Sequence, residues 1–174
     1  MRVRDDMVER PEEPPLLTRA DAWLLAALTE SSREGRPVTL GELVHDADWL
    51  NRSIPTFAEM SFGLPRLIAA GFMTVEAGTP PGLRFQATPK ATRLRASVNA
   101  HTLGDLLVGM EQAVGAAVYP APESAEDRSL GPLPGLQSED LEAAIKAHGE
   151  WVDRWAKPFV AAARLLTKWQ NGKS

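Results

Sequence analysis

The chain contains no cysteine among its 174 residues, and this absence excludes several classes of protein at once. Disulfide scaffolds, thiolate zinc sites and thiol nucleophiles all require cysteine. The chain also lacks any run of 18 apolar residues, which a membrane-spanning helix would need. Its first residues show no apolar segment of the kind found in signal peptides. We therefore expect a cytoplasmic protein with no membrane partner.

An excess of basic charge is also missing, since 19 Lys and Arg stand against 23 Asp and Glu, a net charge of -4. This balance argues against a strongly basic protein that coats nucleic acid, although local basic patches are compatible with it. No Gly-rich phosphate loop, Gly-x-Ser-x-Gly motif or dinucleotide fingerprint is present. We expect a protein that is not an enzyme and that holds no cofactor and no metal.

What the chain does have is a compact series of helix starts. A threonine followed three residues later by an acid is typical of a capping box or a close relative of it, and it occurs at Thr18 with Asp21, Thr39 with Glu42, and Thr56 with Glu59. The third of these predicted helices ends at Gly71, a suitable residue for a left-handed exit. Three starts in about forty residues indicate a compact helical unit.

Two short strands follow, at residues 72–76 and 83–87, around a turn rich in Gly and Pro. Thr88 and Pro89 then predict another helix start, with apolar positions recurring as far as Val114. Where this helix ends or breaks is open, because three glycines weaken it. Beside these elements we expect a mobile tail at 1–17, a long helical extension at 97–118, and a surface linker at 119–137.

The last predicted helix covers residues 138–170 and carries an apolar seam with alternating steps of four and three residues. The seam comprises Leu141, Ile145, His148, Val152, Trp155, Phe159, Ala162, Leu166 and Trp169. Trp151 and Leu165 widen it, so the helix should pack on more than one neighbour, either the first part of the chain or a second copy. Pro158 removes a backbone donor inside this helix and predicts a kink.

Two segments carry a family resemblance. They are Leu64-Pro-Arg-Leu67-Ile-Ala-Ala-Gly71-Phe72-Met, and the end of the hairpin at Phe85-Gln-Ala87-Thr88-Pro89. Together with the order of elements over residues 18–96, they resemble the winged helix-turn-helix domain of MarR-type and PadR-type proteins. The resemblance implies a mainly α fold, with a small β-hairpin wing and long C-terminal helices. It also implies a transcription regulator that binds DNA and forms a homodimer through helices outside the winged unit.

The chemistry of DNA binding requires cations and amide side chains at the groove. The third predicted helix has only one cation, Arg66, which is the only plausible reader of a base there. The wing and the helix after it are more basic, and we expect Arg84, Lys90, Arg93 and Arg95 to contact phosphates. The leading hypothesis is a regulator that binds double-stranded DNA mainly through its wing.

The alternative hypothesis is a protein-interaction or self-association module with no role in DNA binding. It depends on aromatic side chains, because the small winged unit could not bury all of its own aromatics. Exposed aromatics with few charges around them are typical of a surface that binds a protein. These residues are Trp49, Phe57, Phe62, Trp151, Trp155 and Phe159. Core packing against the last helix would instead account for Trp49, Phe57 and Phe62. Small-ligand sensing would need a pocket between the winged unit and the long helices.

Two histidines have candidate roles. Glu42 and His45 lie at the spacing of half a carboxylate di-metal site, but the second half-site is missing, so we interpret them as surface residues. His148 lies on the seam of the last helix, and we interpret it as a hydrogen-bonded core or interface histidine that could make association depend on pH.

Overall fold

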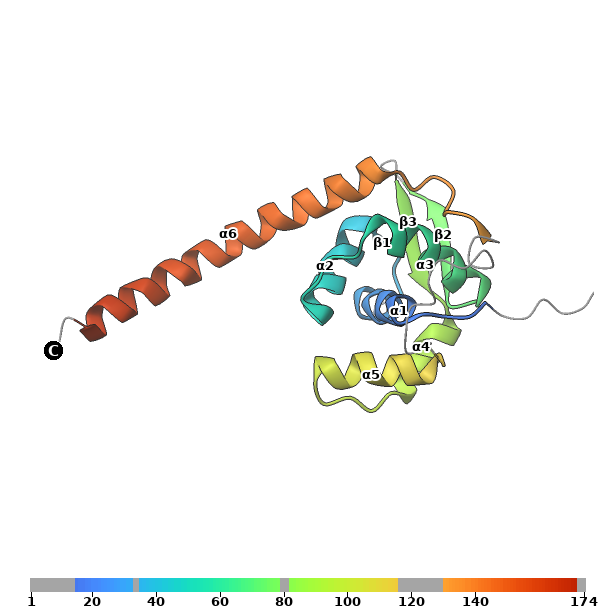
Figure 1. Ribbon diagram of the computed structural model, residues 1–174, viewed down its shortest axis with the longest axis horizontal. Coiled ribbons are helices and arrows are strands. Elements are labelled where there is room, and N and C mark those ends of the chain that lie inside the picture. The colour runs from blue at the N-terminus through green and yellow to red at the C-terminus, as the bar shows by residue number, and fades with distance from the viewer. Residues whose placement is uncertain (1–14, 33–34, 79–81, 116–129, 172–174) are drawn as a thin grey trace, which may run out of the picture.

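The computed structural model describes residues 15–32, 35–78, 82–115 and 130–171, with side chains in the last range described as far as Trp155. These residues form a mainly α fold with a small antiparallel sheet, as the sequence predicts (Figure 1). The elements are α1 (Arg19–Ser31), β1 (Val38–Thr39), α2 (Leu40–Asn51), α3 (Phe57–Ala69), β2 (Met73–Ala77), β3 (Leu83–Ala87), α4 (Pro89–Ser97), α5 (Leu103–Ala113) and α6 (Ser138–Asn171).

The first three helices begin where the threonine pattern predicts. In each, the threonine hydroxyl accepts a hydrogen bond from the backbone N–H three residues on, and the acid there accepts one from the threonine's own N–H. These reciprocal bonds satisfy backbone donors that a helix start would leave without partners, and such a cap contributes about 1 kcal/mol. All three predicted helix starts are confirmed.

The sheet has the strand order β1-β3-β2, with both pairings antiparallel. The two strands predicted as a hairpin are confirmed as β2 and β3, with Val75 opposite Phe85 at the centre of the pairing. Strand β1 was not predicted, and it places Val38 opposite Phe85 and Thr39 opposite Arg84 on the other side of β3. A strand of two residues is too short to show any period.

The core is built around α1, whose residues 21–29 are all buried. This helix contacts α2, α3, α4, α5 and β3, so it runs through the centre of the molecule. Leu24, Leu25 and Leu28 are fully buried there, as is Phe85 of β3. Burial of each such side chain contributes about 1.5 to 3 kcal/mol, which explains why the elements collect around this one helix.

The helix start predicted at Thr88 is confirmed, and the break that the sequence left open lies between α4 and α5. Val98 ends α4 in an extended conformation, and Thr102 begins α5 with a further capping box to Asp105. The Val98 side chain lies against Gly109 of α5, where a larger residue would not fit. The last three residues of the predicted extension, 116–118, lie outside the described residues.

Two segments expected to lie on the surface contribute to the core. Leu17, assigned to the tail, is 5% exposed, and Leu133 and Leu136, assigned to the linker, are also buried. The Leu133 N–H donates to the Ser61 carbonyl of α3, which ties this part of the linker to the body. Those parts of the two assignments are wrong, whereas residues 1–14 and 119–129 lie outside the described residues.

Helix α6 packs on α2 through its first turns and then extends away from the rest of the molecule (Figure 1). Leu141 and His148 are buried in this contact, whereas Trp151, Val152 and Trp155 are exposed. The helix continues through position 158 as one element. Figure 1 shows no sharp bend along α6, so the kink predicted in this helix is not observed.

Candidate functional site

Arg66, the predicted base reader, is not available to DNA. It is 6% exposed, and its Nε and Nη2 atoms donate to the two carboxylate oxygens of Asp21 at 2.7 and 2.9 Å. This bidentate ion pair joins α3 to α1 in the interior. The assignment of Arg66 to DNA binding is therefore wrong, because its guanidinium is used to neutralise a buried carboxylate.

Asp21 has competing influences on its charge. Burial raises the pKa of this carboxyl above its ordinary value of 3.8, while the Arg66 guanidinium and hydrogen bonds from Thr18 act in the opposite direction. The net shift is upward. The ionised carboxylate therefore depends on Arg66, which leaves α3 with no other cation to offer to a ligand.

The outward strip of α3 consists of Ala58, Phe62, Pro65 and Ala69, at steps of four, three and four residues. Ala58 and Ala69 are exposed, and Phe62 and Pro65 are half-buried. None of these side chains can donate a hydrogen bond or carries a charge. The outward strip of α3 therefore presents no group that could read a base, and the one half-buried acid of the helix, Glu59, is engaged by Thr56 in the N-terminal cap.

Of the four side chains predicted to contact phosphates, two make polar contacts within the protein and two do not. Lys90 Nζ donates to the Ala70 carbonyl at 2.6 Å and lies 4.3 Å from the centre of the Phe72 ring, and Arg95 pairs with Glu30 at 2.9 Å. Arg84 is half-buried against Gly78, and Arg93 is exposed. Within the part of the chain that the structure describes, the side chains of Arg84 and Arg93 make no ion pair and no hydrogen bond.

The predicted interaction residues are mostly at the surface. Trp49 at the end of α2 is 61% exposed and Phe57 at the start of α3 is 38% exposed, with Ile54 at 37% between them. In α6, Trp151 and Trp155 are 46% and 57% exposed. Phe159 lies outside the residues whose side chains are described. The alternative in which core packing accounts for Trp49, Phe57 and Phe62 is wrong for Trp49 and Phe57, which are exposed.

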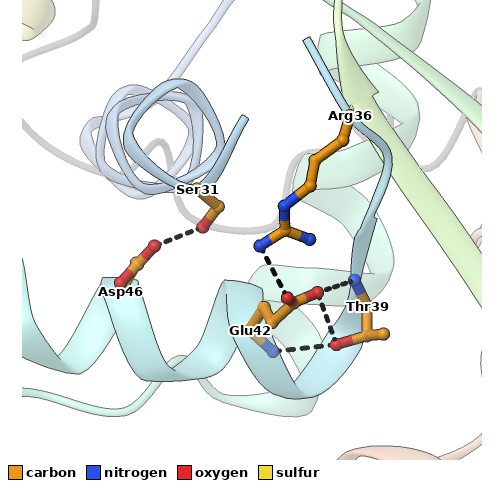
Figure 2. A network of polar contacts seen from close by, with 5 residues as sticks. All are labelled: Ser31, Arg36, Thr39, Glu42 and Asp46. Carbon is orange, nitrogen blue, oxygen red and sulfur yellow. Dashed lines mark hydrogen bonds and ion pairs between the residues drawn. The ribbon is translucent and has the colours of Figure 1, made fainter. Parts of the chain in front are cut away.

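A groove of about 630 Å³ separates the end of α1 and the start of α2 from α6. Its lining includes Glu30, Ser31, Arg36, Thr39, Glu42, His45, Asp46, His148 and Trp151. Figure 2 shows the polar contacts along its rim: Arg36 donates to Glu42 at 2.8 Å, and Ser31 Oγ donates to Asp46 at 2.5 Å. The sequence hypothesis of a pocket between the first helices and a long helix thus has a structural counterpart.

Glu42 is held ionised by this network. Burial alone would raise its pKa, but hydrogen bonds from Arg36 and from the Thr39 backbone and hydroxyl, together with the charge of Arg36, outweigh burial. The pKa of Glu42 is lowered below its ordinary value of 4.5. The same carboxylate therefore caps α2 and carries a fixed negative charge on the rim of the groove.

Two histidines meet where α6 crosses α2. His148 Nε2 lies 3.0 Å from Asp48 Oδ2, and His148 Nδ1 lies 3.2 Å from His45 Nδ1. The interpretation of His148 as a buried, hydrogen-bonded histidine is confirmed. Its contact with His45 was missed, because 103 residues separate the two in sequence and only the docking of α6 brings them together.

This arrangement is not a metal centre of the usual kind. Across residues 15–32, 35–78, 82–115 and 130–155, no three His, Asp or Glu side chains converge in a way that could hold a metal ion.

The described helices also include none with the length and apolar content needed to cross a bilayer. Comparison with known proteins finds no matching family model, no matching curated protein and no matching solved structure.

Proposed function

We propose that this protein is a winged-helix-type module that binds another protein through α3 and the residues before it. Support for the winged-helix part comes from the order α1, β1, α2, α3, β2, β3 and from the strand order β1-β3-β2. The hairpin would be the wing, and α3 would occupy the place of a recognition helix.

The observation that carries the proposal is the apolar character of α3 on its outer side. Its strip of Ala58, Phe62, Pro65 and Ala69 has no donor or charge, and its one cation is buried with Asp21. The exposed Trp49, Ile54 and Phe57 continue this apolar character. Aromatic enrichment with few charges is the composition of a protein interface and the opposite of a DNA-reading surface.

A second candidate function is binding to the DNA backbone through the wing and α4, the regulator hypothesis in a reduced form. The observation that favours it is that Arg84 and Arg93 make no ion pair with the described part of the chain. Two such cations would supply phosphate contacts without base recognition, and binding would weaken steeply with salt.

We also propose that α6 pairs with α6 of a second copy. Val152 and Trp155 are exposed, they continue the seam that begins at the buried Leu141, and the helix extends away from the body. An apolar seam with this spacing is buried when it packs against another helix.

The test compares the wild type with a Phe57→Ser/Phe62→Ser variant. Each protein is chemically cross-linked to its neighbours in cells of the native host, and the cross-linked proteins are identified as candidate partners. Binding of each purified candidate to the wild type and to the variant is then measured. A partner that binds the wild type directly and loses at least about tenfold in affinity with the variant supports the proposal. A matched control is Arg84→Gln/Arg93→Gln, which should bind the partner normally.

The same proteins are titrated into labelled duplex DNA at several salt concentrations. Salt-dependent binding that is lost only in Arg84→Gln/Arg93→Gln would favour the second candidate over protein binding. If no purified partner distinguishes the wild type from Phe57→Ser/Phe62→Ser, the protein-binding proposal is wrong.

A further inference from the structure

The groove between α2 and α6 has a lining with an excess of negative charge. Three carboxylates, Glu30, Glu42 and Asp46, line it together with one guanidinium, that of Arg36. Glu30 is paired with Arg95, so Asp46 supplies the charge in excess. Arg36 is itself engaged by Glu42, as Figure 2 shows. An anionic ligand would therefore meet repulsion with no free cation at the rim to offset it, whereas a cation would be attracted.

Asp46 is the carboxylate of the groove that accepts fewer hydrogen bonds than it could. It is half-buried and accepts one hydrogen bond, from Ser31 Oγ to Oδ2. It has no ion pair with any residue that the structure describes, in contrast to Glu30 and Glu42. An ionised carboxylate can accept about four hydrogen bonds, so a half-buried one with a single donor favours a ligand that brings more.

The histidine pair adds a second acceptor beside Asp46. The Asp48 carboxylate can only accept, so His148 donates to it from Nε2. A neutral His148 then has its lone pair on Nδ1, which accepts the Nδ1 proton of His45. This chain of bonds leaves Nε2 of His45 with a lone pair, and that atom has no partner in the described part of the chain.

An aromatic wall completes the groove. Trp151 of α6 is 46% exposed, and its ring meets the His45 ring edge to face with centroids 4.5 Å apart. An indole face attracts ammonium and guanidinium groups, and it also covers the apolar part of a ligand.

We propose that this groove binds a small organic cation, a primary ammonium or guanidinium group attached to an apolar body. The charged group donates to Asp46 and to Nε2 of His45, and the apolar body lies on Trp151. Because Asp46 and His45 belong to α2 and Trp151 to α6, the ligand holds α6 against the body. The site shares no residue with the α3 surface proposed above, so either proposal can fail without the other.

The test uses three probes of nearly the same shape and different charge: phenethylamine, phenethyl alcohol and phenylacetate. Binding to the full chain is measured at neutral pH by calorimetry and by ligand-observed NMR. We expect phenethylamine to bind at least about tenfold more tightly than phenethyl alcohol, as is typical when a charge-assisted hydrogen bond is added, and phenylacetate to bind least. Equal binding of the three probes, or no binding of phenethylamine at millimolar concentration, would overturn the proposal.

Two variants locate the site. Asp46→Asn keeps an acceptor for Ser31 but removes the charge, and Trp151→Ala removes an exposed ring whose loss should not unfold the protein. Each should weaken phenethylamine binding by about tenfold. Glu150→Gln is the matched control, because Glu150 is exposed on α6 and does not line the groove. If phenethylamine binds both variants as tightly as the control, the groove is not the site.

Discussion

At the scale of the residue, the bond between Asp21 and Arg66 determines what α3 can do. A guanidinium facing solvent could contact a base, but here it forms the polar link between α1 and α3 inside an otherwise apolar core. Buried ion pairs add little net stability, because desolvation of both charges offsets their attraction. Losing one partner is nevertheless costly, since the other charge is then buried alone.

Arg66→Met should therefore lower the free energy of unfolding by about 3 to 5 kcal/mol, because it leaves Asp21 buried and unpaired. The double variant Asp21→Asn/Arg66→Met should lose clearly less than the sum of the two single losses. Urea denaturation followed by circular dichroism measures all three. Additive losses would show that the two side chains do not act as a pair.

Glu42 provides a prediction about pH. Its folded pKa is lowered, so its ionised form stabilises the folded state above the unfolded pKa, and this contribution is lost as pH falls through the folded pKa. Glu42→Gln should reduce stability near pH 7 by about 1 kcal/mol or less, since the ion pair with Arg36 is partly solvated. The difference from the wild type should shrink as pH falls below the ordinary pKa of 4.5, and it should vanish only below the lowered pKa of the folded state. A difference that is constant with pH would contradict this assignment.

At the scale of the element, the helix starts were predictable, and the reason is local chemistry. A threonine and an acid three residues apart satisfy each other's backbone, so the signal is complete within four residues. The same pattern at Thr102 and Asp105 was present but was overlooked, because the period of leucines appeared to continue through it.

The partners of the site were not predictable, because they depend on distant segments. Arg66 meets Asp21 across 45 residues, and His148 meets His45 across 103. Nothing near Arg66 in sequence distinguishes a buried guanidinium from an exposed one. The groove likewise exists only because α6 returns to α2.

The packing of α3 on α1 gives a prediction about glycine. A Cβ on Gly63 would lie 2.6 Å from Asp21 Oδ1 and 3.1 Å from Leu24 Cδ1, so Gly63→Ala should destabilise the protein by about 1 to 3 kcal/mol despite alanine's better helix propensity. Gly149→Ala in α6 is the matched control, because a Cβ there meets nothing within 4 Å. It should stabilise by up to about 1 kcal/mol. Thermal unfolding measures both, and the same sign for the two would contradict this packing.

At the scale of the whole molecule, α6 extends away from the body, and its apolar residues Val152 and Trp155 are exposed (Figure 1). Val152→Glu/Trp155→Glu should convert a self-associating protein into a monomer, because a carboxylate at the centre of a helix pair is buried without a partner. Sedimentation velocity measures the change. Lys146→Glu, an exposed position on the same helix, is the control and should leave association unchanged. If the wild type is itself a monomer, the proposal that α6 pairs with α6 of a second copy is wrong.

Thr39 belongs to two parts of the molecule. It pairs with Arg84 in the sheet, and its hydroxyl and backbone hold the Glu42 carboxylate at the start of α2. The hairpin and the rim of the groove are therefore connected by a single rigid residue, with no loop between them to absorb movement. A displacement of β3 at this residue would therefore also move the start of α2 and the Glu42 carboxylate on the rim of the groove.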